Sequence, residues 1–210
     1  MKIEGTWWGD TITPWTWPKH STSQADLING NDGWDFLNGG GGNDTINGGR
    51  GNDTLYGGSG ADELKGGSLS DQLFGGSGRD VLKGGSGDDF LNGGTGRDAL
   101  TGGSGWDSFV FDTKLGSGNV DTITDFNVTE DNILLGQWVF SNIWLGDLQD
   151  RQFYAAAGAT EGHDKSDRIV YDTTSGGLYY DADGSGSQDA VRFAVVSGAP
   201  HLTAEDFVIV

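Results

Sequence analysis

GGGGNDTIN GGRGNDTLY, the stretch Gly39–Tyr56, contains two copies of a nine-residue unit with paired glycines first, Asp sixth and an apolar residue eighth. The unit recurs nine times from Gly30 to Val110 without insertion or deletion. Residues 21–29 keep Asp26 and Ile28 in the same phase. The sixth-position aspartates of the nine units are Asp35, Asp44, Asp53, Asp62, Asp71, Asp80, Asp89, Asp98 and Asp107. Self-similarity at a constant period predicts a repeat architecture built from one structural unit.

Each unit divides into a turn and a strand. Paired glycines accept backbone angles that other residues avoid, and the last three residues alternate so that the eighth points inward. Two units then form one coil, and successive coils stack as parallel strands about 4.8 Å apart.

Composition narrows the choice of ligand. The chain carries 31 acidic and 12 basic residues, a formal charge of −19, and contains no Cys. The acidic excess disfavours nucleic acid and anionic membranes as partners. The missing thiols exclude disulfides and zinc–thiolate sites. No apolar run reaches the roughly 18 residues of a membrane span, and the first residues do not form a signal peptide. We therefore expect no stable membrane insertion.

Aspartates stacked at coil spacing repel one another, so a cation is needed between them. Carboxylates and glycine carbonyls are hard oxygen ligands, which favour calcium over zinc or copper.

The pattern G-G-x-G-x-D-x-apolar-x resembles the repeats-in-toxin (RTX), hemolysin-type calcium-binding nonapeptides. The resemblance implies an all-β fold, a right-handed parallel β-roll that holds each calcium ion between turns of adjacent coils. It implies two Asp ladders, with up to about eight ions in their gaps: Asp26, Asp44, Asp62, Asp80, Asp98 and Asp35, Asp53, Asp71, Asp89, Asp107. Further ligands would be the carbonyls of second- and fourth-position glycines: Gly40, Gly42, Gly49, Gly51, Gly58, Gly60, Gly76, Gly78, Gly85, Gly87, Gly94, Gly96, Gly103 and Gly105.

One unit departs from the pattern, because Leu69 replaces the fourth-position glycine. A positive φ there would strain a branched residue, so the sites bounded by Asp71 are the doubtful ones. Acid should release the ions and unfold the chain near the reference carboxyl pKa of about 4.

Beyond the repeats, short strands between Gly/Asp/Ser turns predict an antiparallel cap. We expect 1–29 to be an N-terminal cap, 30–110 the β-roll and 111–210 the C-terminal cap. Trp138, Trp144 and Phe153 are the expected bulk of its core. The sequences at 121–126 and 179–184 resemble the segment after the β-roll in serralysin-type secreted metalloproteases.

The last five residues, 206–210, are an acid followed by four apolar residues. In that family such an ending resembles an uncleaved type I secretion signal, and it is equally a last strand. The resemblance implies an extracellular protein that uses the type I secretion apparatus.

Two other acidic motifs have structural explanations. Residues 181–186 resemble half of an EF-hand loop, but Arg192 stands where the bidentate Glu is needed, so a hairpin turn is expected. Asp121 and Asp125 could either bind an ion or solvate a strand face, and we favour the strand face.

No catalytic centre is expected. His20, His163 and His201 are widely separated and lack the zinc-protease spacing. Two alternatives to a calcium-folded secreted protein stay open: a calcium-scaffolded polysaccharide-binding or adhesion module, and the export-and-folding tail of a larger enzyme. Five indoles would either cover the first coil or stack on sugars: Trp7, Trp8, Trp15, Trp17 and Trp34. We expect a monomer.

Overall fold

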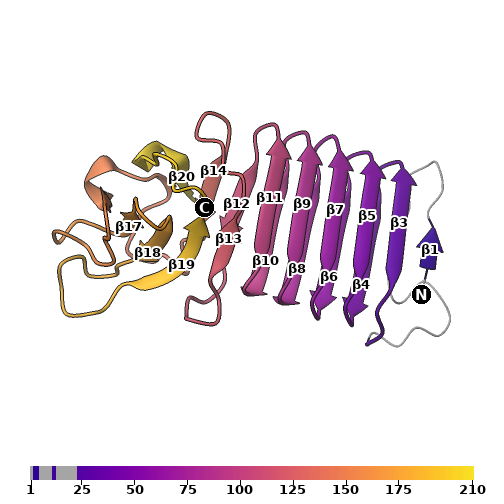
Figure 1. The fold of residues 1–210 in the computed structure, drawn as a ribbon, viewed down its shortest axis with the longest axis horizontal. Helices are drawn as coiled ribbons and strands as arrows, with labels where there is room; N and C mark the ends of the chain where they lie inside the picture. The colour runs from indigo at the N-terminus through magenta and orange to yellow at the C-terminus, as the bar shows by residue number, and fades with distance from the viewer. Residues whose placement is uncertain (1, 5–10, 13–22) are drawn as a thin grey trace.

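The computed structural model describes residues 2–4, 11–12 and 23–210, and over these the chain is built from strands (Figure 1). The helical segments of this part are two 3₁₀ turns, η1 (Asp150–Gln152) and η2 (Ala204–Asp206). Neither is long enough to cross a membrane.

The repeats form a parallel solenoid whose strands alternate between two sheets, sheet A and sheet B. Sheet A takes β1 (Lys2–Glu4), β3 (Leu27–Asp32), β5 (Thr45–Arg50), β7 (Glu63–Ser68), β9 (Val81–Ser86), β11 (Ala99–Ser104) and β13 (Asp121–Ile123). Sheet B takes β2 (Thr11–Ile12), β4 (Phe36–Gly41), β6 (Thr54–Ser59), β8 (Gln72–Gly78), β10 (Phe90–Gly96), β12 (Ser108–Phe111) and β14 (Asn132–Leu135). Within each sheet of the repeat region, partners are 18 residues apart, as for Leu55 and Leu73. This confirms two units per coil and the parallel β-roll.

The inside of the roll is one row of eighth-position side chains, contributed by the two sheets in turn. Each is fully buried, with 0% exposure: Leu37, Ile46, Leu55, Leu64, Leu73, Leu82, Leu91, Leu100 and Phe109. Because neighbouring residues point outward, one apolar side chain per unit fills the narrow space between the sheets.

The outer faces of the two sheets differ. On sheet B the rings of Phe36, Tyr56, Phe74 and Phe90 form a contact row, with centroids 5.3, 4.8 and 5.7 Å apart. Such cross-strand aromatic pairs stabilise neighbouring strands. Tyr56 and Phe74 are ninth-position residues, whereas the ninth positions on β5, β7, β9 and β11 of sheet A are polar: Asn47, Lys65, Lys83 and Thr101.

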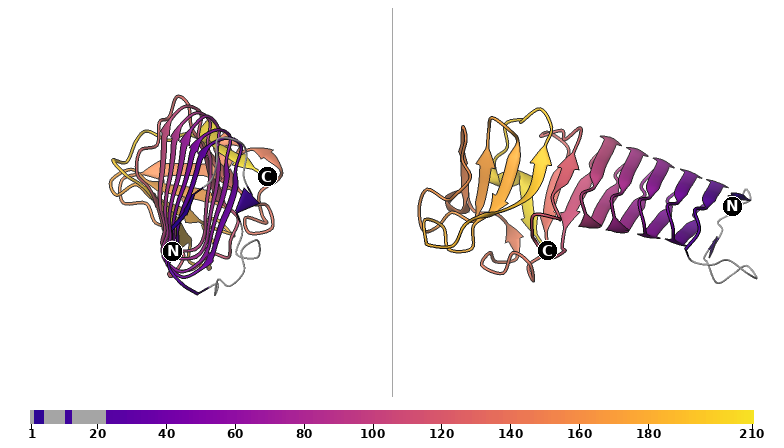
Figure 2. Two further views of the ribbon diagram at one scale, coloured as in Figure 1. Left: turned by 90° about the vertical axis from the view of Figure 1, so that its right-hand side faces the viewer. Right: turned by 60° about the horizontal axis from the view of Figure 1, so that its bottom comes forward.

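The C-terminal residues continue the roll and then close it (Figure 2). The strands are β15 (Gly146–Asp147), β16 (Phe153–Ala156), β17 (Ile169–Asp172), β18 (Gly177–Tyr180), β19 (Val191–Val196) and β20 (Phe207–Ile209). β19 adds to β13 and β20 adds to β14, both in parallel. The antiparallel pairs of the cap are β17 with β18, β18 with β19 and β15 with β20, while β16 and β17 are parallel.

The cap has its own aromatic core, but not the expected one. The ring of Phe140 packs edge-on against Tyr180 and Phe193, at 5.0 and 5.2 Å. The prediction that Trp138 and Trp144 supply this core is wrong, because they are 72% and 83% exposed. Both lie in turns after β14, from which Phe140 and Ile143 point inward instead. Phe153 is half-buried and packs on the ring of Phe207, 5.5 Å away.

Candidate metal centre

The sixth-position aspartates are linked from coil to coil by their own backbone. The N–H of Asp44 donates to Oδ1 of Asp62 at 2.7 Å, and the N–H of Asp53 donates to Oδ1 of Asp71 at 2.8 Å. The same bond, 2.7 to 3.0 Å long, joins each pair of neighbours in both series. The structure therefore forms the two ladders in the predicted order, beginning at Asp26 and Asp35.

Both ladders run one step further than predicted. The N–H of Asp98 donates to Oδ1 of Asp121, and that of Asp107 to Oδ1 of Asp131, each at 3.0 Å. The expectation that Asp121 solvates a strand face is wrong, because it is only 3% exposed. The signal for both was the triplet Asp-x-apolar at 121–123 and 131–133, hidden by insertions that break the nine-residue phase.

Asp125, the other acid named with Asp121, is exposed and outside the ladders. Its carboxylate accepts hydrogen bonds from the backbone N–H groups of Gly102 and Gly103, both at 3.0 Å. It thus caps the last repeat turn rather than extending a row of acids.

In eight of the ladder residues, the second carboxylate oxygen is buried without a donor among the described residues. From Asp35 to Asp107 these residues are 0 to 3% exposed. In the part of the chain that the structure describes, Oδ2 is shielded from solvent and accepts no hydrogen bond in Asp44, Asp53, Asp62, Asp71, Asp80, Asp89, Asp98 and Asp107. A buried, unpaired carboxylate oxygen is strongly unfavourable unless a cation or a proton neutralises it.

Burial raises the pKa values of the ladder carboxyl groups. Desolvation raises the pKa to about 6 in Asp44, Asp53, Asp62, Asp80, Asp98 and Asp107, and to about 7 in Asp71 and Asp89. Burial, with the charge of nearby Asp98, raises the pKa of Asp121 to about 8. Without a cation, these groups would therefore hold protons close to neutral pH.

A carbonyl oxygen of the next coil faces the same space as Oδ2 in Asp44, Asp53, Asp62, Asp71 and Asp80. A Cβ placed on Gly57 would lie 2.5 Å from Oδ2 of Asp62 and 2.6 Å from the carbonyl oxygen of Gly75. At Gly75 the equivalent atoms, Oδ2 of Asp80 and the carbonyl oxygen of Gly93, would both lie 2.6 Å away. Oxygen atoms that lie close together in this way can serve as ligands of a hard cation.

The predicted second- and fourth-position carbonyls point into the gaps between coils. The carbonyl oxygens of Gly40 and Gly42 face Gly58 and Gly60, so closely that a Cβ on either would collide with them. Gly58 and Gly60 have φ of 108° and 133°, which only glycine adopts readily. This contact recurs along the roll wherever one repeat turn follows another on the same side.

The last two repeat turns face loops instead of further repeats. Near Gly94 and Gly96, the hydroxyl of Thr113 donates to the carbonyl of Gly94 at 2.8 Å, and the side chain of Asn119 accepts from the N–H of Gly96 at 2.5 Å. The turn with Gly103 and Gly105 meets Asp125 as described. The carbonyls of these four glycines therefore lack the facing glycine turn that the other predicted ligands have.

Leu69 takes the backbone conformation of the glycine it replaces. Its φ is 76°, as the repeat pattern predicts, and its side chain is 57% exposed. Asp71 nevertheless keeps both ladder hydrogen bonds at 2.8 Å. The backbone of the unit is thus strained at Leu69 without displacing the ladder.

The acidic motifs of the cap have local partners. Residues 181–190 join the antiparallel strands β18 and β19. This confirms the prediction that the EF-hand-like sequence forms the turn of a hairpin. His163, Asp164 and Asp167 also bring potential ligand atoms together. Oδ2 of Asp167, however, accepts from the backbone N–H groups of His163 and Asp164, at 2.6 and 2.8 Å, so it already stabilises a turn.

Of the predicted indole cluster, the structure describes Trp34, which is 74% exposed. Trp7, Trp8, Trp15 and Trp17 lie outside the described residues.

Comparisons with known proteins identify the repeats. The family "RTX calcium-binding nonapeptide repeat (4 copies)" matches residues 20–46, 29–64, 39–73, 65–100 and 84–112. Among solved structures, the solution structure of the AlgE6R3 subunit of the Azotobacter vinelandii mannuronan C5-epimerase is 27% identical, with a TM-score of 0.45. That match covers 75% of this chain and 80% of the other. The comparison with curated proteins gives no match.

Proposed function

Residues 20–112 carry RTX calcium-binding nonapeptide repeats, folded from residue 27 as a parallel β-roll, and we propose that calcium is the switch that folds them. The ions would lie between successive turns on each side of the roll. Their ligands would be the ladder carboxylates and the glycine carbonyls that face the next coil. When bound, the ions supply positive charge between carboxylates that otherwise repel one another.

The observation that carries this proposal is the row of buried Oδ2 atoms without a donor. A folded, ion-free roll at neutral pH must either bury these charges or take up protons, and both oppose folding. Because the gaps form only when coils stack, the free energy of ion binding becomes free energy of folding.

The magnitudes fit such a switch. Extracellular calcium modules bind with Kd values of roughly 10⁻⁴ to 10⁻³ M. An ion at about ten times its Kd stabilises a fold by about 1.4 kcal/mol. Up to eight such ions would add about 11 kcal/mol, comparable to the total stability of a domain, about 5–15 kcal/mol. Calcium can therefore decide whether the roll exists.

We further propose that the protein is extracellular and leaves the cell through the type I secretion apparatus. In a compartment poor in calcium, the repeats would stay unfolded and exportable, and they would fold once outside. The segment that resembles a secretion signal is β20, whose Phe207 and Ile209 are buried. The secretion apparatus would thus recognise β20 in its unfolded form, and the same segment would complete the cap after export.

The second candidate function is a calcium-scaffolded module that binds polysaccharide. It is favoured by a cavity between the roll and the cap, lined by arginines and small apolar side chains. In this reading calcium still folds the roll, and the folded roll presents the binding surface. Neither candidate needs a reaction catalysed by this chain.

A calcium titration followed by far-UV circular dichroism tests the folding switch. We expect a cooperative gain of β-structure as calcium rises from chelator to about 10 mM, above the Kd range of extracellular modules. Magnesium serves as the control, because it demands a small octahedral site and should not fold the roll. A chain already folded in chelator at neutral pH, and unchanged by calcium, would refute the proposal.

A further inference from the structure

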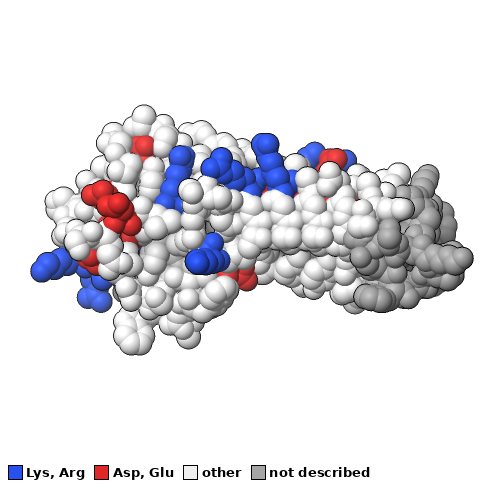
Figure 3. Space-filling view, turned by 90° about the horizontal axis from the view of Figure 1, so that it is seen from below, with Lys and Arg blue, Asp and Glu red and all other residues white. Residues whose placement is uncertain are grey.

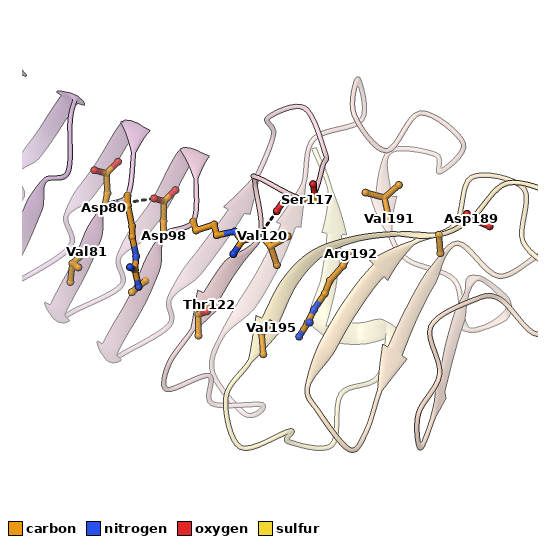
Figure 4. A pocket seen from close by; sticks show the side chains of 14 residues that line it. Asp80, Val81, Asp98, Ser117, Val120, Thr122, Asp189, Val191, Arg192 and Val195 are labelled. Atoms are coloured by element: carbon orange, nitrogen blue, oxygen red, sulfur yellow. Dashed lines mark hydrogen bonds between the residues drawn. The ribbon is translucent and has the colours of Figure 1, made fainter.

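A cavity of about 880 Å³ lies where the roll meets the cap (Figure 4). One wall is the outer side of sheet A, with Val81 and Ala99. The other is formed by β19 and the residues before it, including Val191 and Val195. The loop between β12 and β13 contributes Ser117 and Val120. The site is thus built from three separate parts of the chain.

Three arginines line this cavity: Arg79, Arg97 and Arg192. They are a quarter of the 12 basic residues in a chain of net charge −19. Among the described residues, the ion pairs join Glu63 to Lys65 and Lys83, so none of the three arginines is neutralised by a carboxylate within 4.0 Å. Cations that gather without internal partners are available to an anionic ligand.

Two of the guanidinium groups are held in place. Arg97 donates through Nη2 to the carbonyl oxygen of Ser117 at 2.6 Å, which leaves its other donors free for a ligand. Arg192 lies over the ring of Tyr179, 5.9 Å from its centroid, and its buried Nε has no hydrogen-bond acceptor among the described residues. Held donors lose little rotational freedom when they bind an anion.

The basic character continues along sheet A. Arg79 and Arg97 occupy the same place in successive coils, and Lys65 and Lys83 repeat in the same way on β7 and β9, where the two lysines share the single carboxylate of Glu63. Figure 3 shows Lys and Arg gathered along one long edge of the molecule. The strands β4, β6, β8 and β10 of sheet B contain no Lys or Arg. Positive charge therefore follows one side of the roll, repeated at a coil spacing of about 4.8 Å.

The lining distinguishes between classes of anion. Guanidinium groups bind planar carboxylates through paired hydrogen bonds. The valines and Ala99 offer apolar contact to the faces of a ring, and the Thr122 hydroxyl and Asp189 carboxylate can bond to ligand hydroxyls. Duplex DNA carries a charge every 1.7 Å or so, much closer than the coil spacing of about 4.8 Å at which the arginines repeat. Rings that carry hydroxyls and widely spaced carboxylates fit best.

We propose that this cavity, with the basic side of sheet A, binds the carboxylate groups of a linear acidic polysaccharide. The inference rests on the second candidate function and requires the calcium-loaded roll. Arg97 and Arg192 bind carboxylates at the junction, Arg79 binds one a coil further along, and the apolar lining contacts the sugar rings. Calcium then controls binding indirectly, because the arginines converge only in the folded chain.

Calorimetry with oligogalacturonate tests this on the whole calcium-loaded chain, with free calcium held constant. We expect Arg79→Gln and Arg192→Gln each to weaken binding about tenfold, the loss of one charged hydrogen bond. Arg97→Gln should weaken binding by a similar factor. Because Arg97 also holds the loop at Ser117, Arg79→Gln and Arg192→Gln remain valid tests if that loop loosens in Arg97→Gln. Arg151→Gln is the matched control, since Arg151 is exposed on η1, and should leave affinity unchanged.

The ligand offers a second control, because the methyl ester of the same oligomer keeps the rings and removes the charge. We expect the ester and a neutral chitooligosaccharide not to bind at the arginines. Polyphosphate that bound as tightly as the uronate would show a general anion site and overturn the proposal. So would unchanged oligogalacturonate affinity in Arg79→Gln and Arg192→Gln. Circular dichroism of each variant in calcium separates these outcomes from a failure of the folding switch.

Discussion

The backbone N–H of Asp80 donates a 2.8 Å hydrogen bond to Oδ1 of Asp98, its counterpart one coil further along. This bond turns the carboxylate so that one oxygen joins the coils, while Oδ2 stays buried without a donor. A proton-free, ion-free carboxylate in this position would destabilise the roll. The same side chain thus sets the register of the coils and creates the demand for a cation.

Neighbouring aspartates allow a matched test of the ladder. Asp89 is buried in the ladder, whereas the adjacent Asp88 is exposed and accepts a hydrogen bond from the N–H of Trp106. Asp89→Asn keeps the acceptor oxygen but removes the charge that the ions need. We expect it to raise the calcium concentration at the folding midpoint and to cost about 3–5 kcal/mol in calcium, as when one partner of a buried charge pair is removed.

Asp88→Asn should change both quantities little, since it keeps the hydrogen bond and lies in solvent. Urea unfolding and calcium titration of the two variants measure the effects. Equal behaviour of the two would contradict a specific role for the ladder.

The response to pH should reverse between ion-free and calcium-loaded protein. The ladder pKa values are raised by burial from 3.8 to about 6 or 7, as in Asp80 and Asp89, so the folded roll binds more protons than the unfolded chain. In chelator, stability is therefore greatest in acid and is lost as pH rises through about 6 to 7. In calcium, protons compete with the ions for the carboxylates. The calcium concentration at the folding midpoint should therefore rise as the pH falls through the same range.

This places acid release of the ions well above the reference pKa of about 4. Circular dichroism at a series of pH values, with and without calcium, checks both directions. A calcium midpoint that stays constant from pH 8 or so to about 4.5 would show that the ladder carboxylates are not buried ligands.

Leu69 is a site where the chain can be stabilised. Its φ of 76° costs a non-glycine residue about 1–2 kcal/mol, and its exposed side chain gives little back. Leu69→Gly should stabilise the calcium-loaded roll by about 0.5–1 kcal/mol, after the greater flexibility of glycine in the unfolded chain is subtracted. Leu145→Gly, at another exposed leucine, should be neutral or destabilising. A loss of stability at Leu69 would show that its side chain has a packing role.

The last strand should be essential to the cap. Phe207 is fully buried on β20 and packs against Phe153. Phe207→Ala should cost about 3–5 kcal/mol in calcium, as for other buried aromatic residues. Val208→Ala, on the half-buried side of the same strand, should cost about 1 kcal/mol. Similar urea midpoints for the two variants would indicate that β20 is loosely attached.

The repeat region could be read almost completely from the sequence, because one residue type dominates each physical role in every unit. Glycine allows the turn, Asp forms the ladder, and one apolar residue fills the core. At Leu69 even the departure was informative, since a fourth-position residue must take the φ of the glycine it replaces.

The cap was harder because its strands pair with distant segments. That β19 joins β13 and β20 joins β14 depends on the end of the roll, which no local pattern shows. Trp138 and Trp144 were misplaced because size alone does not say which side of a turn a ring takes. Asp131 was missed because an insertion shifts its spacing from Asp107 to 24 residues.

Locating the ions tests the central claim most directly. A crystal structure of the calcium-loaded protein, with anomalous scattering recorded for calcium, would show them. We predict two rows of peaks, one along each ladder, next to the Oδ2 atoms of residues such as Asp62 and Asp71. An ordered roll whose ladder gaps contain no peaks at saturating calcium would contradict the account.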